Sequence, residues 1–332
     1  MPHYDESTLA FRNLEPEQIL ATLENLGFDC DGRLLTLNSY ENRVYRLGIE
    51  SGDPVVAKFY RPGRWSDDQI LEEHEFSAEL ASMDIPVVPP IRVGGETLHH
   101  SGYFRVPISP CWGGRAPELD DKKLMQQLGR LIARIHLIGE QKSFIHRERL
   151  NTEDYGVGSA AYLLNNDFIP AEMTEVYQGV TTHLFTEINE RFRCADDIKE
   201  IRLHGDFHCS NVLVNSEQLH IVDLDDARTG PAIQDLWMLL SGDYNEQTPQ
   251  LANLLEGYAE FRNFDARELQ LVEALRALRI IYYAGWLARR WQDPAFQIAF
   301  PWFNSRRYWD EHILSLREQV ALMNENPLSW NE

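Results

Sequence analysis

The chain has 332 residues, of which 43% are hydrophobic and 25% charged, and its formal net charge is −21. This length is too great for one small core and fits two lobes, and the composition is that of an ordinary globular protein. The strong acidic charge argues against a nucleic-acid or anionic-membrane binder, because it repels phosphate groups at long range. It favours a neutral or cationic acceptor instead.

No membrane span or export signal is evident in the sequence. Apolar runs fall short of the roughly 18 residues that a spanning helix requires, and the first residues are polar and acidic. They lack the basic and apolar regions of a secretory signal. We therefore expect a cytoplasmic protein without a membrane anchor.

The cysteines are far apart and form no CxxC pair, which argues against a zinc site. In the cytoplasm they are expected to be reduced thiols. One of them lies inside the motif described below, where it is either a small buried residue or a position sensitive to oxidation. The four are Cys30, Cys111, Cys194 and Cys209.

The N-terminal part is predicted to begin with a helix and a β-hairpin. Residues 15–27 have apolar side chains at helical spacing, with Pro16 at a first-turn position and Gly27 at the end. Residues 43–47 and 55–60 are rich in β-branched and aromatic side chains and flank a turn that contains Gly, Asp and Pro. This pattern indicates two antiparallel strands.

A second helix is predicted over residues 67–83, with Asp67 or Ser66 as its N-cap. The proline-rich segment 85–93 is expected to be extended, and residues 102–108 to form a short strand. The side chains of the helix predicted to point inward are Ile70, Phe76, Leu80 and Met83.

The remainder is predicted to be mainly helical, with apolar stripes over residues 121–139 and 268–291. Between them, residues 211–215 and 219–224 flank a polar turn and predict a second hairpin. A Pro/Gly-rich stretch follows residue 107 and marks a boundary. We therefore expect an α+β, bilobal fold with a small antiparallel sheet in an N-lobe (1–107) and a mainly helical C-lobe (108–332).

The segment HGDFHCSN carries the chemistry. Asp206 and Asn211 lie on a loop that runs into the first strand of the second hairpin, and Asp223 ends the second strand. An Asp, an Asn five positions later and then a strand-borne Asp is the order of a kinase catalytic loop. Phosphoryl transfer requires a carboxylate for the acceptor hydroxyl and oxygen ligands for magnesium. We assign Asp206 to the hydroxyl, and Asn211 and Asp223 to the metal.

An alternative interpretation makes His204, Asp206 and His208 a metal-hydrolase triplet. No second ligand cluster of suitable spacing follows downstream. His204 is therefore expected to hold the catalytic loop by hydrogen bonds.

Lys58 is predicted to bind phosphate. It lies on the face of its strand opposite Ala57 and Phe59, where a lysine on the inner face can reach the α- and β-phosphates of ATP. It then requires a carboxylate partner, and the following helix offers Glu72, Glu73 and Glu75.

The turn before the first predicted hairpin contains no GxGxxG. Its residues Asn38 and Ser39 can offer backbone N–H groups and a hydroxyl to phosphate oxygens. Ser39 is the candidate ATP contact, with a plain turn residue as the alternative.

Three more aspartates adjoin these motifs. Asp225 and Asp226 follow Asp223 closely, and Asp225 is a candidate for a second magnesium ion or a cationic acceptor, or else part of a charged loop. Asp235 begins a short helix and is expected to cap that helix or to brace the catalytic loop.

The segments NSYENRVYRL, VVAKFYRPGRW, LHGDFHCSNVL and VDLDDARTGPAIQDLWML resemble the bacterial stress response kinases of the aminoglycoside phosphotransferase and choline kinase-like superfamily. The resemblance covers roughly residues 15–310. NSYENRVY and DLDDARTGPAIQDLWML extend beyond the HGDxHxxN and VDxxDA motifs of the superfamily. The resemblance implies that the α+β, bilobal fold is protein-kinase-like. It also implies a monomeric, cytoplasmic serine/threonine protein kinase of the cell-envelope and oxidative stress response, which uses ATP and magnesium and phosphorylates itself.

Carried over by position, the resemblance makes Asp206 the proton acceptor, places Asn211 and Asp223 on magnesium, and places Ser39 at the ATP site. The distance along the sequence from the helix carboxylate to Leu80 and Pro86 favours Glu73 over Glu72 as the partner of Lys58.

The chain departs from ordinary protein kinases because it lacks a glycine-rich loop, a DFG triplet and an APE segment. Activity on proteins is therefore implied by the resemblance alone. The alternative is a small-molecule kinase that acts on an amino alcohol, a sugar or an antibiotic. A non-catalytic nucleotide-binding scaffold is disfavoured by the intact Lys58, Asp206, Asn211 and Asp223.

Overall fold

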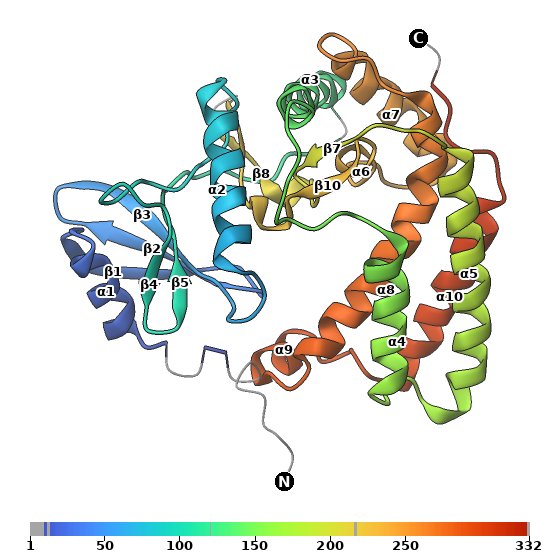
Figure 1. Ribbon diagram of the computed structural model, residues 1–332, viewed down its shortest axis with the longest axis horizontal. Coiled ribbons are helices and arrows are strands. Elements are labelled where there is room, and N and C mark those ends of the chain that lie inside the picture. The colour runs from blue at the N-terminus through green and yellow to red at the C-terminus, as the bar shows by residue number, and fades with distance from the viewer. Residues whose placement is uncertain (1–9, 12–13, 120, 216–217, 331–332) are drawn as a thin grey trace. The chain divides into compact units, whose positions relative to one another are not determined.

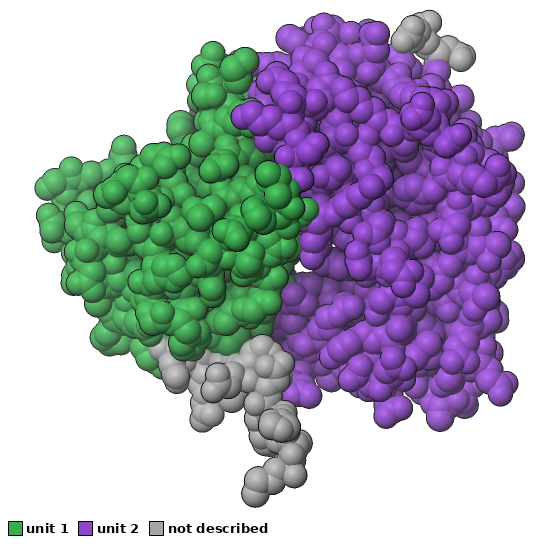
Figure 2. Space-filling model, viewed as in Figure 1, with its two compact units in different colours: residues 1–117, 145–147, 210–226 green, residues 118–144, 148–209, 227–332 purple. Residues whose placement is uncertain are grey.

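The computed structural model describes residues 10–11, 14–119, 121–215 and 218–330. The chain packs as two compact units, shown in Figure 2. The bounds of the lobes expected from the sequence stay a prediction. In the structure, two segments from far along the chain belong to the same unit as the N-terminal residues. Unit 1 contains residues 1–117, 145–147 and 210–226, and unit 2 contains residues 118–144, 148–209 and 227–332.

Unit 1 is built on a four-stranded antiparallel sheet in the order β1-β2-β3-β6 (Figure 1). The predicted hairpin is present as β2 and β3. The predicted strand 102–108 is instead two short strands, because Pro107 has no N–H for a ladder. The strands are β1 (Cys30–Leu37), β2 (Arg43–Ile49), β3 (Gly52–Phe59), β4 (His99–Ser101), β5 (Phe104–Val106) and β6 (Ile108–Pro110).

Two helices accompany this sheet. In α1 (Pro16–Asn25), Ile19 and Leu23 are buried in the apolar cluster under the sheet. Helix α2 (Asp67–Ser82) begins at a capping box in which Ser66 accepts the N–H of Gln69.

Three of the four side chains of α2 predicted to point inward are buried, but Met83 is 55% exposed. Met83 follows the last helical residue. The chain turns there, so the helical periodicity no longer applies to this side chain.

The second predicted hairpin belongs to unit 1. It consists of β8 (Val212–Asn215) and β9 (Gln218–Ile221), paired antiparallel. The turn residues 216–217 lie outside the described residues. Short 3₁₀ turns adjoin both strands: η4 (Cys209–Asn211) precedes β8, and η5 (Leu224–Asp226) follows β9. The residues of the candidate metal site thus lie at the open end of one hairpin.

Unit 2 is mainly helical. Helices α5, α8 and α10 pack together around a large apolar core, and α4 packs on α8 (Figure 1). Among the described residues, no helix is long and apolar enough to cross a bilayer. The elements are α3 (Lys122–Gly139), η2 (Glu153–Val157), α4 (Gly158–Asn165), η3 (Ala171–Met173), α5 (Thr174–Cys194), β7 (Glu200–Leu203), β10 (Arg228–Pro231), α6 (Gln234–Trp237), α7 (Tyr244–Tyr258), η6 (Ala266–Leu271), α8 (Val272–Arg290), α9 (Pro294–Ala299) and α10 (Arg306–Met323).

Helices α3 and α7 approach each other through a reciprocal pair of glycines. A Cβ at Gly129 of α3 would overlap the carbonyl oxygen of Leu254, and a Cβ at Gly257 of α7 would overlap that of Gln126. Backbone atoms cannot move aside as a flexible side chain can. Both positions therefore require glycine for packing, and the helices cannot tolerate even a methyl group between them.

Gly129→Ala is expected to lower the free energy of unfolding by at least about 1 kcal/mol, because overpacking outweighs the gain in helix propensity. Gly179→Ala is the matched control: Gly179 is also helical, in α5, but faces open space. It should raise stability by roughly 0.5–1 kcal/mol. Thermal denaturation checks both, and equal stabilisation by the two substitutions would contradict the close helix contact.

Candidate active site

A cavity of about 280 Å³ lies in unit 1, and the sheet face that carries Lys58 forms one wall. In the ladder, Leu37 pairs with Val44 and Val44 with Lys58. Val56 pairs with Ser109. Residues directly opposite in a ladder share a face, and all five line the cavity. The cavity therefore places apolar side chains beside a lysine ammonium.

The turn between β1 and β2 also lines this cavity, through Asn38 and Ser39. Ser39 Oγ accepts the N–H of Asn42 at 3.4 Å. Asn42 in turn accepts the N–H of Arg61 at 3.1 Å and donates its side-chain N–H to Asp225. The turn that contains Ser39 is thus held in place by the buried Asn42.

Lys58 is held by two carboxylates. Its Nζ lies 3.0 Å from Asp223 Oδ1 and 2.6 Å from Asp225 Oδ1. Burial alone would lower the pKa of the Lys58 ammonium, but the charges of Asp223 and Asp225 outweigh it and raise the pKa above its ordinary value. The lysine therefore stays charged in the cavity.

Asp225 is buried and both of its carboxylate oxygens have partners. Oδ1 contacts Lys58, and Oδ2 accepts the side-chain N–H of Asn42 and lies 3.9 Å from Arg64. Burial tends to raise the pKa of Asp225, but Lys58 and Arg64 lower it to about 2. These contacts favour an anchor for Lys58 over a ligand for a second metal ion.

The two glutamates left open by the sequence have different surroundings. Glu73 is buried, lines the same cavity as Lys58, and accepts the hydroxyl of Tyr60 at 3.0 Å. Burial raises the pKa of Glu73 to about 7, although the Lys58 charge opposes this. Glu72 accepts the backbone N–H groups of residues 145–147 at 2.5, 2.8 and 2.7 Å. Glu72 therefore anchors a loop, whereas Glu73 shares the cavity with Lys58, whose ion pairs are with Asp223 and Asp225.

Asn211 and Asp223 flank the β8–β9 hairpin and line the cavity together. The backbone N–H of Val222 donates to the carbonyl of Asn211 at 3.0 Å, so the chain before Asp223 is held against Asn211. Asp223 has a left-handed backbone with φ of 63°, a conformation that Asp tolerates better than most residues. It turns the chain sharply after β9.

Asn211 and Asp223 fit a magnesium ion that is shared with phosphates. Mg²⁺ takes one or two protein oxygens and fills its octahedron with water and phosphate oxygens. A protein-only cage of three or more His, Cys, Asp or Glu side chains is absent from the described part of the chain. The donor set suits a metal that arrives with a nucleotide.

In unit 2, the loop after β7 carries Asp206 and is braced by its neighbours. Gly205 has φ of 85°, which glycine adopts readily. The buried Asp235 accepts the backbone N–H groups of His204 and Gly205, each at 2.8 Å. Gln234 donates to the carbonyl of Gly205 at 2.9 Å. Asp235 therefore braces the loop, which was one of the two roles expected for it.

The carboxylate of Asp206 contacts side chains of unit 2. Arg279 of α8 donates to Oδ1 at 2.6 Å, and His208 Nε2 lies 3.3 Å from Oδ2. Burial would raise the pKa of Asp206, but His208 and Arg279 hold it well below its usual range. Asp206 is therefore an ionised carboxylate.

His204 differs from a metal ligand in its surroundings. Its side chain is 1% exposed, stacks edge-on to Phe207, and its Nδ1 lies 3.4 Å from the backbone N–H of Asp206. This favours a histidine that supports the loop over one that binds a hydrolytic metal. Cys209 has a free thiol and is partly buried.

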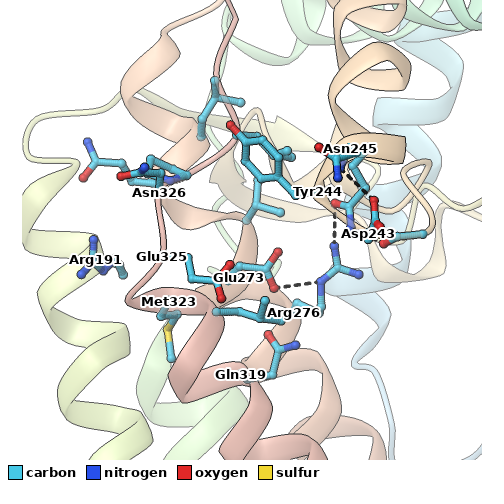
Figure 3. A pocket seen from close by; sticks show the side chains of 18 residues that line it. Arg191, Asp243, Tyr244, Asn245, Glu273, Arg276, Gln319, Met323, Glu325 and Asn326 are labelled. Atoms are coloured by element: carbon cyan, nitrogen blue, oxygen red, sulfur yellow. Dashed lines mark hydrogen bonds and ion pairs between the residues drawn. The ribbon is translucent and has the colours of Figure 1, made fainter.

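A second cavity, of about 380 Å³, lies in unit 2 and is shown in Figure 3. Arg276 on its wall contacts Glu273 and Gln247, each at 3.2 Å, and lies over the ring of Trp237. Trp237 donates to Gln234, the residue that holds the carbonyl of Gly205. This cavity therefore adjoins the side chains that support the catalytic loop.

Several residues of the site were not predicted from the sequence. Asn42 donates a hydrogen bond to Asp225, and Arg64 forms an ion pair with it. Arg279 donates a hydrogen bond to Asp206. Asn42 and Arg64 lie in the segments NSYENRVYRL and VVAKFYRPGRW, where neither was given a role, and Arg279 belongs to a helix whose pattern indicated only an apolar stripe. The role of each of these residues follows only from its contact with a residue far away in the sequence.

The sequence comparisons identify relatives over nearly the full chain. A family model described as phosphotransferase enzyme family matches residues 34–272. Stress response kinase A of Escherichia coli K12 is 41% identical over 325 residues, or 98% of each chain. A Salmonella typhimurium protein named serine/threonine protein kinase RdoA is 42% identical, again over 98% of each chain.

Solved structures confirm the expected α+β, kinase-like fold. The amicoumacin kinase hAmiN, in complex with AMP-PNP and Ca²⁺, has a TM-score of 0.71 at 18% identity and 96% coverage of each chain. Spectinomycin phosphotransferase APH(9)-Ia has a TM-score of 0.62 at 17% identity, with 92% of this chain and 97% of that chain covered. The chain therefore belongs to the phosphotransferase enzyme family and, within it, to the bacterial stress response kinase A proteins.

Proposed function

We propose that the chain is a monomeric, cytoplasmic serine/threonine protein kinase of the cell-envelope and oxidative stress response, which uses ATP and magnesium and phosphorylates itself. The observation that carries the nucleotide site is the cavity of unit 1. It combines an apolar wall, the ammonium of Lys58 and the oxygens of Asn211 and Asp223. The protein acceptor is supported by the names of the relatives, at 41–42% identity.

In this proposal the adenine of ATP lies against the apolar wall formed by Val44 and Val56, near Pro107. Lys58 contacts the phosphates, with Glu73 close by to compensate its charge once ATP competes for the lysine. Ser39 contributes its hydroxyl and the backbone of its turn. The phosphates are thus neutralised by groups that the sheet already holds in place.

Asn211 and Asp223 are the proposed ligands of the magnesium ion, which would neutralise charge on the transferred phosphoryl group. Asp206 accepts the proton of the acceptor hydroxyl. The hydroxyl oxygen forms the new bond to the γ-phosphorus, and the bond from that phosphorus to the oxygen of ADP breaks. Because Asp206 is ionised, it is ready to take this proton at neutral pH.

The pairing of Asp206 with Arg279 favours a neutral hydroxyl acceptor over a cationic one. An exposed carboxylate would attract the ammonium of an amino alcohol or aminoglycoside, but here a guanidinium already compensates the charge. A small-molecule kinase remains the second candidate function, because the neighbours by structure include an aminopropanol kinase with a TM-score of 0.63 at 19% identity.

Asp223→Asn is expected to lower turnover by at least about 100-fold, because loss of a charged ligand weakens the metal that stabilises the transferred group. The substitution keeps a side chain that tolerates the left-handed backbone. Initial rates over a magnesium series check this. Asp53→Asn, at an exposed position of β3, is the control and should retain full activity. Unchanged turnover in Asp223→Asn would remove the metal assignment.

The variants Glu73→Gln and Glu72→Gln test whether the two glutamates have different roles. Glu73→Gln should raise the KM for ATP roughly tenfold, since each 1.4 kcal/mol of lost interaction is worth a factor of ten. Glu72→Gln should leave that KM within about twofold and lower stability by about 1 kcal/mol, because it removes the charge of an acceptor that holds three backbone N–H groups. ATP titrations and thermal denaturation of both variants check this, and the reverse pattern would exchange the two roles.

Incubation with γ-labelled ATP tests the acceptor. We expect label on serine and threonine side chains of the protein itself and of added peptides, and none of this label with Asp206→Ala. Label found only on an amino alcohol, sugar or antibiotic from a metabolite panel would establish the second candidate function instead.

A further inference from the structure

Helix α8 brings a side chain to the catalytic carboxylate itself. Arg279 Nη1 lies 2.6 Å from Asp206 Oδ1. The contact joins positions 73 residues apart in the sequence. It is therefore a product of the fold of unit 2, where the apolar stripe of α8 is buried in the core and Arg279 points out of it.

Besides Arg279, His208 contacts the Asp206 carboxylate, at 3.3 Å from Oδ2, whereas Asp235 and Gln234 act on the backbone of the loop. Asp235 accepts backbone N–H groups of His204 and Gly205, and Gln234 binds the carbonyl of Gly205. These bonds fix where the Cα of Asp206 lies, but they do not fix the rotation of its carboxylate, since the χ2 angle of Asp is soft. A guanidinium on one oxygen does restrain that rotation.

Charge leads to the same conclusion. Asp206 is three-quarters removed from water, with a side chain 24% exposed. Burial without a cation would shift a carboxylate toward its protonated form, which cannot accept a proton. Arg279 supplies a permanent positive charge. A carboxylate has about four lone-pair positions, so contacts from Arg279 and His208 still leave room for an acceptor hydroxyl.

We propose that Arg279 is a positioning residue for phosphoryl transfer, which holds the Asp206 carboxylate ionised and in the orientation that receives the acceptor hydroxyl. The proposal rests on the proposed function of Asp206 as the proton acceptor. Arg279 acts through Asp206 and takes no part in bond making or bond breaking.

A purely structural role predicts something different. An ion pair between partly exposed groups contributes little to stability, and its loss would leave turnover unchanged. Arg279→Gln and Arg279→Lys are therefore compared with Arg307→Gln. Arg307 of α10 also pairs with a carboxylate of unit 2, Glu311 at 2.7 Å, but does so on an exposed helix surface.

The experiment uses the full chain and a mixture of serine- and threonine-containing peptides with labelled ATP. We expect Arg279→Gln to lower kcat roughly 10- to 100-fold, the scale of a misplaced catalytic group. Binding of a non-hydrolysable ATP analogue, measured by calorimetry, should stay within about twofold. Arg279→Lys should recover much of the rate, and Arg307→Gln should match wild type.

The pH dependence of kcat/KM gives a second readout that a structural role would not move. Turnover requires ionised Asp206; burial raises the pKa of that carboxyl, and His208 and Arg279 lower it. Without Arg279 the pKa rises, so the acidic limb of the profile should move to higher pH in Arg279→Gln. The limb should remain in place in Arg307→Gln.

The outcomes distinguish this proposal from the one it rests on. If Asp206→Ala is inactive but Arg279→Gln keeps the wild-type kcat and pH profile, the role of Arg279 is wrong and that of Asp206 stands. If Asp206→Ala keeps wild-type activity, both are wrong. A parallel loss of thermal stability and ATP binding in Arg279→Gln and in Arg279→Lys would also overturn the positioning role.

Discussion

An ammonium group placed inside a protein needs carboxylates around it, and the arrangement of unit 1 follows from that requirement at Lys58. Its side chain is 20% exposed, and Asp223 and Asp225 balance its charge. Asp225 is itself held by Asn42, whose turn contains Ser39. The strand, the turn and the β8–β9 hairpin are therefore joined through one charge cluster, and a bound triphosphate would have to share the lysine with these aspartates.

The loop that contains Asp206 is held at both its backbone and its side chain. Asp235 and Gln234 hold the backbone at Gly205, and Arg279 holds the side chain of Asp206. Asn211 follows only five positions later in the sequence and belongs to unit 1. In the proposed mechanism, four residues of this loop therefore separate the base Asp206 from the metal ligand Asn211.

The sequence predicted the features that depend on local patterns. The alternation of side chains predicted on which face of its strand Lys58 lies, and the turn residues predicted both hairpins. It did not predict β1, because Gly32 and an irregular register interrupt the alternation of that strand. The residues alone left Glu72 and Glu73 open, since adjacent residues on one helix differ only in what they face, and only the resemblance favoured Glu73. Arg279 was missed because its role depends on a contact between distant positions.

A structure determined with magnesium and a non-hydrolysable ATP analogue tests the central claim most directly. We predict a metal ion coordinated by the side chains of Asn211 and Asp223, with Lys58 Nζ on a phosphate oxygen and the adenine ring against Val44 and Val56. It would be contradicted by a nucleotide bound elsewhere on the chain, or by a metal ion held by His204 and His208 in place of the hairpin residues.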